Sequence, residues 1–122
     1  TRKIFHDDNL KITTTTVRIP VMRSHCESVL IETKKRVTPD EVRELLSKAP
    51  GVKVFDDPSN NIYPTPIATQ GQDIIYVGRI RQDTSSENGI WLWVCGDQIR
   101  KGAATNAIQI GEVLIERGLL DK

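Results

Sequence analysis

Short runs of apolar and β-branched residues, separated by polar turns, dominate most of this chain. Such runs are typical of β-strands, and they predict strands at residues 11–20, 27–33, 52–55, 73–81 and 89–95. In the last run, GIWLWVC, apolar side chains point to both faces, which indicates a strand covered on both sides. Pro20 cannot donate to a ladder, so the first strand ends there or lies at a sheet edge.

Two helices are predicted by apolar residues at helical spacing. The first begins after Thr38, because a threonine N-cap, Pro39 at the first helical position and Glu41 at the third form a capping box. The Pro-Gly pair at residues 50–51 ends it. The second helix covers residues 102–117. Its expected buried side carries Ala103, Ala107, Ile110, Val113 and Leu114.

The order of these elements is strand, strand, helix, strand, long loop, strand, strand, helix. Strands that mostly follow one another without a helix between them predict an α+β fold, with a mostly antiparallel mixed sheet and helices on one face. Residues 56–72 form the long loop, which contains three prolines. A long ordered loop in a compact domain is commonly functional or interfacial.

Composition narrows the function classes. The chain has 122 residues, 38% of them hydrophobic, and a formal net charge of +1, which suits one globular domain and argues against nucleic acid or an anionic membrane as the main partner. No apolar run approaches the roughly 20 residues that a membrane span needs. Cys26 and Cys95 are too few for a disulfide scaffold and lack zinc-site spacing, so we expect reduced thiols in a cytoplasmic protein.

The stretch RIPVMRSHCE carries the first candidate chemistry. Arg18, at a strand end, can hold a carboxylate with its planar fork, and His25 can act as a general acid or base near neutral pH. An exposed strand arginine and a turn histidine explain the same residues, and spacing does not decide between the two interpretations. Cys26 follows His25 directly, and neighbours on a strand face opposite ways, which argues against a Cys–His nucleophilic pair. Cys95 lies in an apolar strand and is expected in the core.

The sequence supports a metal site or a phosphate site less than it supports the chemistry of Arg18 and His25. His6, Asp7, Asp8, His25 and Cys26 lack the spacing of metal ligands, and neither GxGxxG nor a Walker A motif is present. The second helix opens with small residues after Lys101, which permits either close approach of an anion or close packing on a sheet. Arg79 and Arg81 alternate on one strand, where a solvated face is the common outcome and an anion or subunit contact the rarer one.

Five stretches follow the motif order of a known enzyme family: RIPVMRSHCESVLIE, DDPSNNIYPTP, VGRIRQD, NGIWLWV and IRKGAATNAIQI. Together they span nearly the whole chain, which resembles the C-terminal portion of the aspartate-semialdehyde dehydrogenase family. These enzymes reduce β-aspartyl phosphate to aspartate semialdehyde with NADPH through a cysteine thioester. The resemblance implies that His25 is the general acid/base and that Arg18 binds the substrate carboxylate. It also implies that Gly102 and Asn106 lie at the cofactor side of the cleft.

The resemblance also implies what this chain lacks. The family's nucleophilic cysteine, its dinucleotide fingerprint and further substrate-binding residues lie in an earlier segment, so we expect this chain alone to be inactive and NADP to be bound mainly by an absent N-terminal domain. Residues 1–100 would belong to the substrate-binding and dimerisation domain. Residues 101–122 would form the C-terminal helix that returns to the dinucleotide-binding domain. A homodimer or homotetramer would assemble through the sheet.

The chain departs from the family pattern at two positions, and two alternative functions remain open. The residue before the histidine is commonly Gly in the family and is Ser24 here, and the residue after it is commonly Ser and is Cys26 here. Both changes can alter the surroundings of His25. The alternatives are an N-acetyl-glutamyl-phosphate reductase-like enzyme and a non-catalytic dimerisation module.

Overall fold

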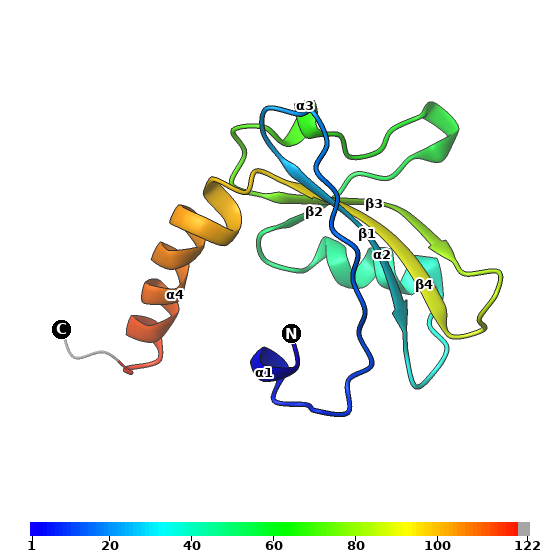
Figure 1. Ribbon diagram of the computed structural model, residues 1–122, viewed down its shortest axis with the longest axis horizontal. Helices are drawn as coiled ribbons and strands as arrows, with labels where there is room; N and C mark the ends of the chain where they lie inside the picture. Colours follow the sequence, from blue (N-terminus) through cyan, green and yellow to red (C-terminus); the bar gives the residue numbers. More distant parts are fainter. Residues whose placement is uncertain (120–122) are drawn as a thin grey trace.

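A computed structural model describes residues 1–119 and contains one four-stranded sheet (Figure 1). The strands are β1 (His25–Glu32), β2 (Val52–Val54), β3 (Ile75–Gln82) and β4 (Gly89–Gly96). Their order is β1-β4-β3-β2, with β1/β4 and β4/β3 antiparallel and β2/β3 parallel. This confirms the α+β class and the mostly antiparallel mixed sheet.

The helices are between four and 12 residues long. They are α1 (Arg2–Phe5), α2 (Pro39–Ser47), α3 (Pro66–Thr69) and α4 (Thr105–Glu116), with 3-10 turn η1 at Pro58–Asn60 and irregular turn η2 at Arg100–Ala104. The predicted capping box of α2 is confirmed: the Glu41 amide donates to the Thr38 hydroxyl at 3.3 Å, and the Thr38 amide donates to the Glu41 carboxylate at 2.7 Å. Figure 1 shows α4 extending away from the sheet.

The hydrophobic core lies between α2 and one face of the sheet. Val77, Ile80 and Ile90 are buried there, and Val42 and Leu46 of α2 pack against them. The opposite face carries Trp91, Trp93 and Cys95 on β4. The indole of Trp93 donates to the Pro64 carbonyl at 2.9 Å, so part of the loop 56–72 lies over this second face. Cys95 is fully buried, as expected.

The prediction of a strand at residues 11–20 was wrong. The structure assigns no strand to this segment, and all its residues are exposed. β-Branched residues favour an extended backbone, but a strand also needs a neighbour for its ladder. Within the described part of the chain, no strand pairs with this segment. The missing partner therefore overrides the local propensity.

The C-terminal helix begins later than predicted. Regular helix starts at Thr105, because Gly102 has a φ of +90° and Lys101 and Ala103 also leave helical geometry. A left-handed φ is accessible to glycine at little cost, and this bend separates α4 from the end of β4. None of the helices among residues 1–119 is long and apolar enough to cross a membrane.

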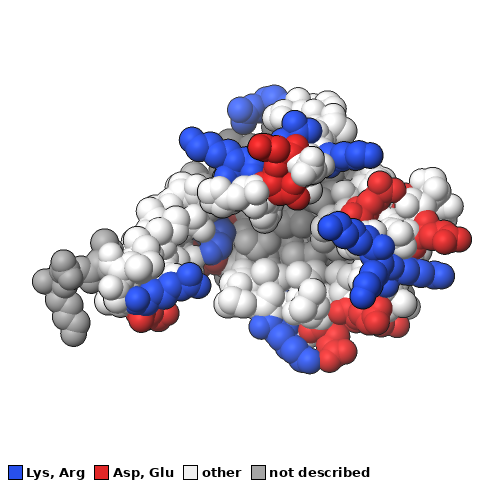
Figure 2. Space-filling model, turned by 90° about the horizontal axis from the view of Figure 1, so that it is seen from below, with Lys and Arg blue, Asp and Glu red and all other residues white. Residues whose placement is uncertain are grey.

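Charges of both signs are interspersed on the face of the molecule seen in Figure 2, and no patch of one sign dominates it. This distribution agrees with the near-neutral net charge.

Candidate functional site

A cavity of about 330 Å³ lies where β1 begins, β4 ends and the chain turns into α4. Antiparallel pairing sets His25 opposite Gly96, and Glu27 opposite Val94. The turn η2 then brings the helix start back toward the strand ends. The residues that line the cavity are His25, Glu27, Ile75, Val94, Gly96, Gln98, Lys101, Gly102 and Asn106.

Three of the four predicted site residues are therefore brought together. His25, Gly102 and Asn106 line one cavity although about 80 positions separate the histidine from the other two. Arg18 does not line it, since it lies on the exposed segment 11–20. Cys26 also does not line it, because its thiol contacts Cys95 on the other face of the sheet.

Two glycines shape the cavity. A Cβ on Gly96 would overlap the Cδ1 methyl of Ile75, so this glycine makes room for the Ile75 side chain at the edge of the cavity. A Cβ on Gly102 would meet nothing within 4 Å, so this glycine serves the left-handed backbone and leaves open space above it. The cavity is thus filled by Ile75 at Gly96 and open at Gly102.

His25 has a carboxylate partner that the sequence reasoning missed. Its Nε2 lies 2.9 Å from Oε1 of Glu27, and both side chains are more than half exposed. Residues two apart on a strand point to the same side, so the period of β1 could have identified Glu27. A carboxylate at this distance orients the imidazole ring.

The backbone before His25 is held by buried polar contacts. Ser24, with a φ of +83°, donates its amide to Oε1 of Gln98 at 2.8 Å. The Ser24 hydroxyl donates to the Pro66 carbonyl at 3.1 Å and accepts from Thr69 at 2.9 Å. A left-handed φ explains why glycine suits this position. In this chain serine occupies it, with side-chain hydrogen bonds that offset the backbone strain.

Asp97 anchors the same region from the end of β4. Its carboxylate is fully buried and accepts from Arg23 at 2.5 Å, from the Gly71 amide at 2.8 Å and from the Ile99 amide at 3.0 Å. Burial by itself raises the pKa of Asp97, but the two amides and the Arg23 charge outweigh it, so the pKa lies below the usual value. Asp97 therefore stays charged and ties three segments together beside the cavity.

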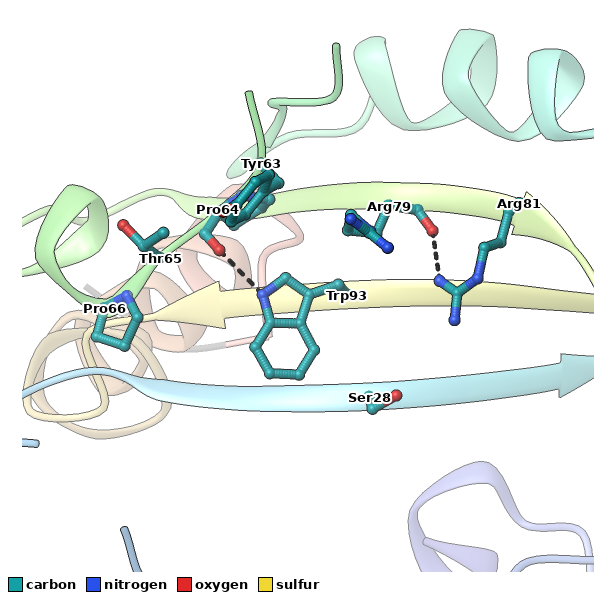
Figure 3. Close-up of a pocket in the computed structure, with 8 residues that line it drawn as sticks. All are labelled: Ser28, Tyr63, Pro64, Thr65, Pro66, Arg79, Arg81 and Trp93. Atoms are coloured by element: carbon teal, nitrogen blue, oxygen red, sulfur yellow. Dashed lines mark hydrogen bonds between the residues drawn. The ribbon is translucent and has the colours of Figure 1, made fainter. Parts of the chain in front are cut away.

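A second cavity, of about 440 Å³, lies on the sheet face opposite α2 (Figure 3). Its lining residues are Ser28, Tyr63, Pro64, Thr65, Pro66, Arg79, Arg81 and Trp93. The guanidinium of Arg79 lies 5.9 Å from the Tyr63 ring centre, and that of Arg81 lies 5.5 Å from the Trp91 ring centre. Stacking on aromatic rings holds both arginines on this face.

Metal chemistry finds no support in the described residues. Among residues 1–119, no three His, Cys, Asp or Glu side chains gather closely enough to hold a metal ion.

Comparison with known proteins matches this geometry to one family. Residues 1–101 match the family model described as the semialdehyde dehydrogenase dimerisation domain. The chain is 55% identical over 120 residues to aspartate-semialdehyde dehydrogenase of Aquifex aeolicus (98% of this chain, 35% of that protein). It is 52% identical over 120 residues to the Synechocystis sp. enzyme (98% and 36%).

A solved structure agrees with the sequence relatives. Aspartate semialdehyde dehydrogenase II from Vibrio cholerae, complexed with ASA, superimposes with a TM-score of 0.88 at 40% identity, over 94% of this chain and 34% of that one. The chain thus spans about a third of the length of the relatives it matches. The predicted resemblance is confirmed: the chain belongs to the semialdehyde dehydrogenase dimerisation-domain family and corresponds to the C-terminal domain of aspartate-semialdehyde dehydrogenase.

Proposed function

We propose that this chain supplies the acid/base histidine and the dimerisation surface of an NADP-dependent enzyme that converts β-aspartyl phosphate to aspartate semialdehyde. The observation that carries this proposal is the cavity that joins His25 and Glu27 of β1 to Gly102 and Asn106 of the α4 turn. The histidine and its carboxylate lie on one strand, and the helix start that completes the cavity follows about 80 positions later in the chain.

His25 is the proton carrier in this proposal. Thioester chemistry needs a proton removed from the attacking thiol and a proton returned to the carbonyl oxygen. The Glu27 carboxylate, 2.9 Å from Nε2, fixes the orientation of the ring during these steps. The side chain of His25 is more than half exposed, so substrate can reach it.

The cofactor would lie at the open rim of the same cavity. Nothing lies within 4 Å of the Cβ position at Gly102, which leaves room for a flat ring, and the amide of Asn106 can both donate to and accept from a carboxamide. When bound, NADPH supplies the hydride. The dinucleotide-binding domain, and with it most of the cofactor site, would come from the part of the family's fold that this chain does not span.

Arg18 is proposed to bind the substrate carboxylate through its planar fork. The resemblance to the family supports this role. The segment 11–20, which carries Arg18, is also exposed and has no ladder partner among residues 1–119, so its side chains are available to a ligand. A neighbouring strand contributed by the rest of the enzyme would place Arg18 toward the substrate. Replacement by lysine should chiefly raise KM, since lysine lacks the fork.

Dimerisation is proposed to use the sheet face opposite α2. This face carries Trp91 and Trp93 with the partly exposed Leu30 and Tyr63. Aromatic residues are enriched in the cores of protein interfaces. In a hybrid enzyme, Leu30→Glu should lower the mass measured by light scattering toward that of the monomer. Leu45→Glu, an exposed α2 control on the other side of the core, should leave it unchanged.

The activity is testable in a hybrid enzyme in which this chain replaces the matching 35% of the Aquifex aeolicus relative. Phosphate-dependent oxidation of aspartate semialdehyde with NADP measures the reaction. His25→Ala should lower kcat/KM by about 10²–10⁴-fold. His6→Ala, the other histidine of the chain, is the matched control and should have no effect.

Three results would reject parts of this proposal. Unchanged activity in His25→Ala would remove the acid/base role. Preference for N-acetyl-glutamate semialdehyde over aspartate semialdehyde would favour the reductase-like alternative. A folded, dimeric hybrid without either activity would favour a non-catalytic dimerisation module.

A further inference from the structure

The two cysteines of the chain lie opposite each other on neighbouring strands. The register of β1 and β4 pairs Cys26 directly with Cys95, and their Sγ atoms are 2.9 Å apart. Direct partners in an antiparallel pair have Cα atoms about 4.5–5.5 Å apart, which lies inside the range of about 4.4–6.8 Å that disulfides bridge. The backbone therefore already meets the geometry of a bond between these sulfurs.

The two thiols differ in their access to solvent. Cys95 is fully buried, whereas Cys26 is partly exposed. Burial raises the pKa of the Cys95 thiol, and the adjacent Cys26 raises it further. Cys95 thus stays protonated and protected, so in the isolated chain a small oxidant from solvent reaches Cys26 first. Pairing of two chains through this sheet face, as proposed above, would shield both thiols. An exposed first thiol beside a resolving second thiol is the arrangement that redox-sensitive pairs use.

The surroundings favour a bond between the thiols over other cysteine chemistry. No third ligand accompanies them among residues 1–119, so a metal site is unsupported. His25 precedes Cys26 but faces the other side of the sheet and is engaged with Glu27. Neither thiol lines the cavity that holds His25. The pair is thus separate from the proposed acid/base chemistry yet adjacent to it in the chain.

We propose that Cys26 and Cys95 form a reversible cross-strand disulfide, a redox modification site coupled to the position of His25. With hydrogen peroxide as oxidant, the Cys26 thiolate attacks one peroxide oxygen and the O–O bond breaks. The products are a sulfenic acid on Cys26 and hydroxide, which takes up the proton that the thiol has lost and leaves as water. The Cys95 sulfur then displaces the hydroxyl, forms the S–S bond and gives up its proton, which leaves with the hydroxyl as a second water. Two electrons pass from the thiols to one peroxide, and a dithiol reductant reverses the change.

Coupling to His25 follows from the register. His25 is bonded directly to Cys26 and pairs with Gly96, which follows Cys95. A covalent link one position away fixes the spacing of β1 and β4 at the edge of the cavity. Bond formation also draws the two sulfurs closer than their present 2.9 Å, and this change next to His25 alters the surroundings of its ring. This inference concerns the chain itself and does not depend on the proposed enzymatic activity.

The test uses the purified 122-residue chain, fully reduced and then treated with equimolar hydrogen peroxide. Intact mass without reductant should fall by two hydrogen atoms and return after dithiothreitol. A tryptic digest should link the peptide of residues 24–34 to that of residues 82–100. Oxidised Cys26 with a freely alkylated Cys95 after unfolding, or a disulfide between two chains, would overturn the proposal.

Two matched variants and a second readout complete the test. Cys95→Ser should leave Cys26 as a sulfenic acid that dimedone traps, and Cys26→Ser should make the chain resistant to the same peroxide dose. The His25 ring protons, followed by NMR, should shift on oxidation in the wild type and stay fixed in Cys95→Ser. A linked chain with unmoved His25 resonances would overturn the coupling.

Discussion

Two buried carboxylates, Asp56 and Asp97, use the same chemistry for different purposes. Both side chains are fully buried, each follows the end of a strand, and each receives one arginine and two backbone amides. Burial of a charge is costly unless it is paired and hydrogen-bonded, and these donor sets meet that requirement. The difference lies in which segments donate.

Asp56 draws its donors from the hydrophobic core. Arg43 of α2 lies 2.9 Å from it, and the amides of Arg79 and Ile80 donate at 2.7 and 3.2 Å. Those amides form the bulge of β3, where Arg79 has a φ of +52°. Asp97 instead joins three connecting segments around the start of β1. We infer that Asp56 stabilises the fold, while Asp97 positions the cavity.

The largest expected effect is on stability, at Asp56. Asp56→Ala leaves the buried Arg43 interaction and two amides without their acceptor, so we expect the free energy of unfolding to fall by about 3–5 kcal/mol. Denaturant titration measures it. Asp40→Ala is the matched control, because Asp40 pairs with the same Arg43 but is 95% exposed, and it should cost at most about 1 kcal/mol. Equal losses would contradict the role of burial.

Asp97→Asn should act on activity more than on stability. The amide retains an acceptor oxygen but loses the charge that holds Arg23, so the backbone leading to His25 relaxes. We expect kcat/KM of the hybrid enzyme to fall by up to about 100-fold, the scale of a small misplacement of a reacting group. Asp56→Ala, assayed at a temperature where it is folded, should keep its activity per folded molecule. If both variants lose activity in proportion to their loss of stability, the distinction between a stabilising Asp56 and a positioning Asp97 is wrong.

Two substitutions at Ser24, near Asp97, distinguish the cost of its left-handed backbone from the contribution of its side-chain hydrogen bonds. Ser24→Ala keeps a side chain at a φ of +83° and loses the contacts with Thr69 and Pro66, so it should destabilise by about 1–2 kcal/mol. Ser24→Gly loses the same contacts but relieves the left-handed strain, and it should be more stable than the alanine variant by about 1 kcal/mol. Thermal unfolding of the two variants, compared directly, measures the strain. No difference would mean that the backbone relaxes without cost.

The smallest effect concerns Asp73, an exposed carboxylate paired with an arginine. Hydrogen bonds from Arg100 and then Thr105 lower the pKa of Asp73 to about 2. A carboxyl group with a lowered folded pKa stabilises the protein above its unfolded pKa of about 4 and loses that contribution as pH falls toward about 2. Asp73→Asn should therefore flatten the pH dependence of Tm between pH 4 and pH 2.

The same acid titration distinguishes the exposed from the buried carboxylate. Asp97 also has a lowered pKa, so part of the acid sensitivity should persist in Asp73→Asn. A profile that matches the wild type would show that the Asp73–Arg100 pair is screened by solvent.

Local sequence predicted much of the fold. The capping box at Thr38 and Glu41 fixes where α2 begins, because its hydrogen bonds join residues three apart. The strands with a neighbour in this chain were also predicted, with ends shifted by a few residues. The segment 11–20 has equal β-propensity but failed as a strand, since a ladder partner is a property of the assembled sheet.

Some residues of the candidate site could likewise be found from local sequence, and others could not. Arg18 and His25 were singled out by motif, and Glu27 could have been found from the period of β1. Asp56 and Asp97 carry no such signal, because their donors lie up to 74 positions away along the chain. That Cys26 and Cys95 lie opposite each other likewise depends on the register between β1 and β4.

The sequence by itself determined the helix caps, the strand propensities and the family, because these rest on contacts or motifs within a few residues. Only the tertiary structure decided that His25, Gly102 and Asn106 share a cavity, that two carboxylates are buried with full sets of donors, and that the thiols meet. Those features require strands and loops distant in sequence to pack in one register, and the free energy of that packing comes from the whole sheet.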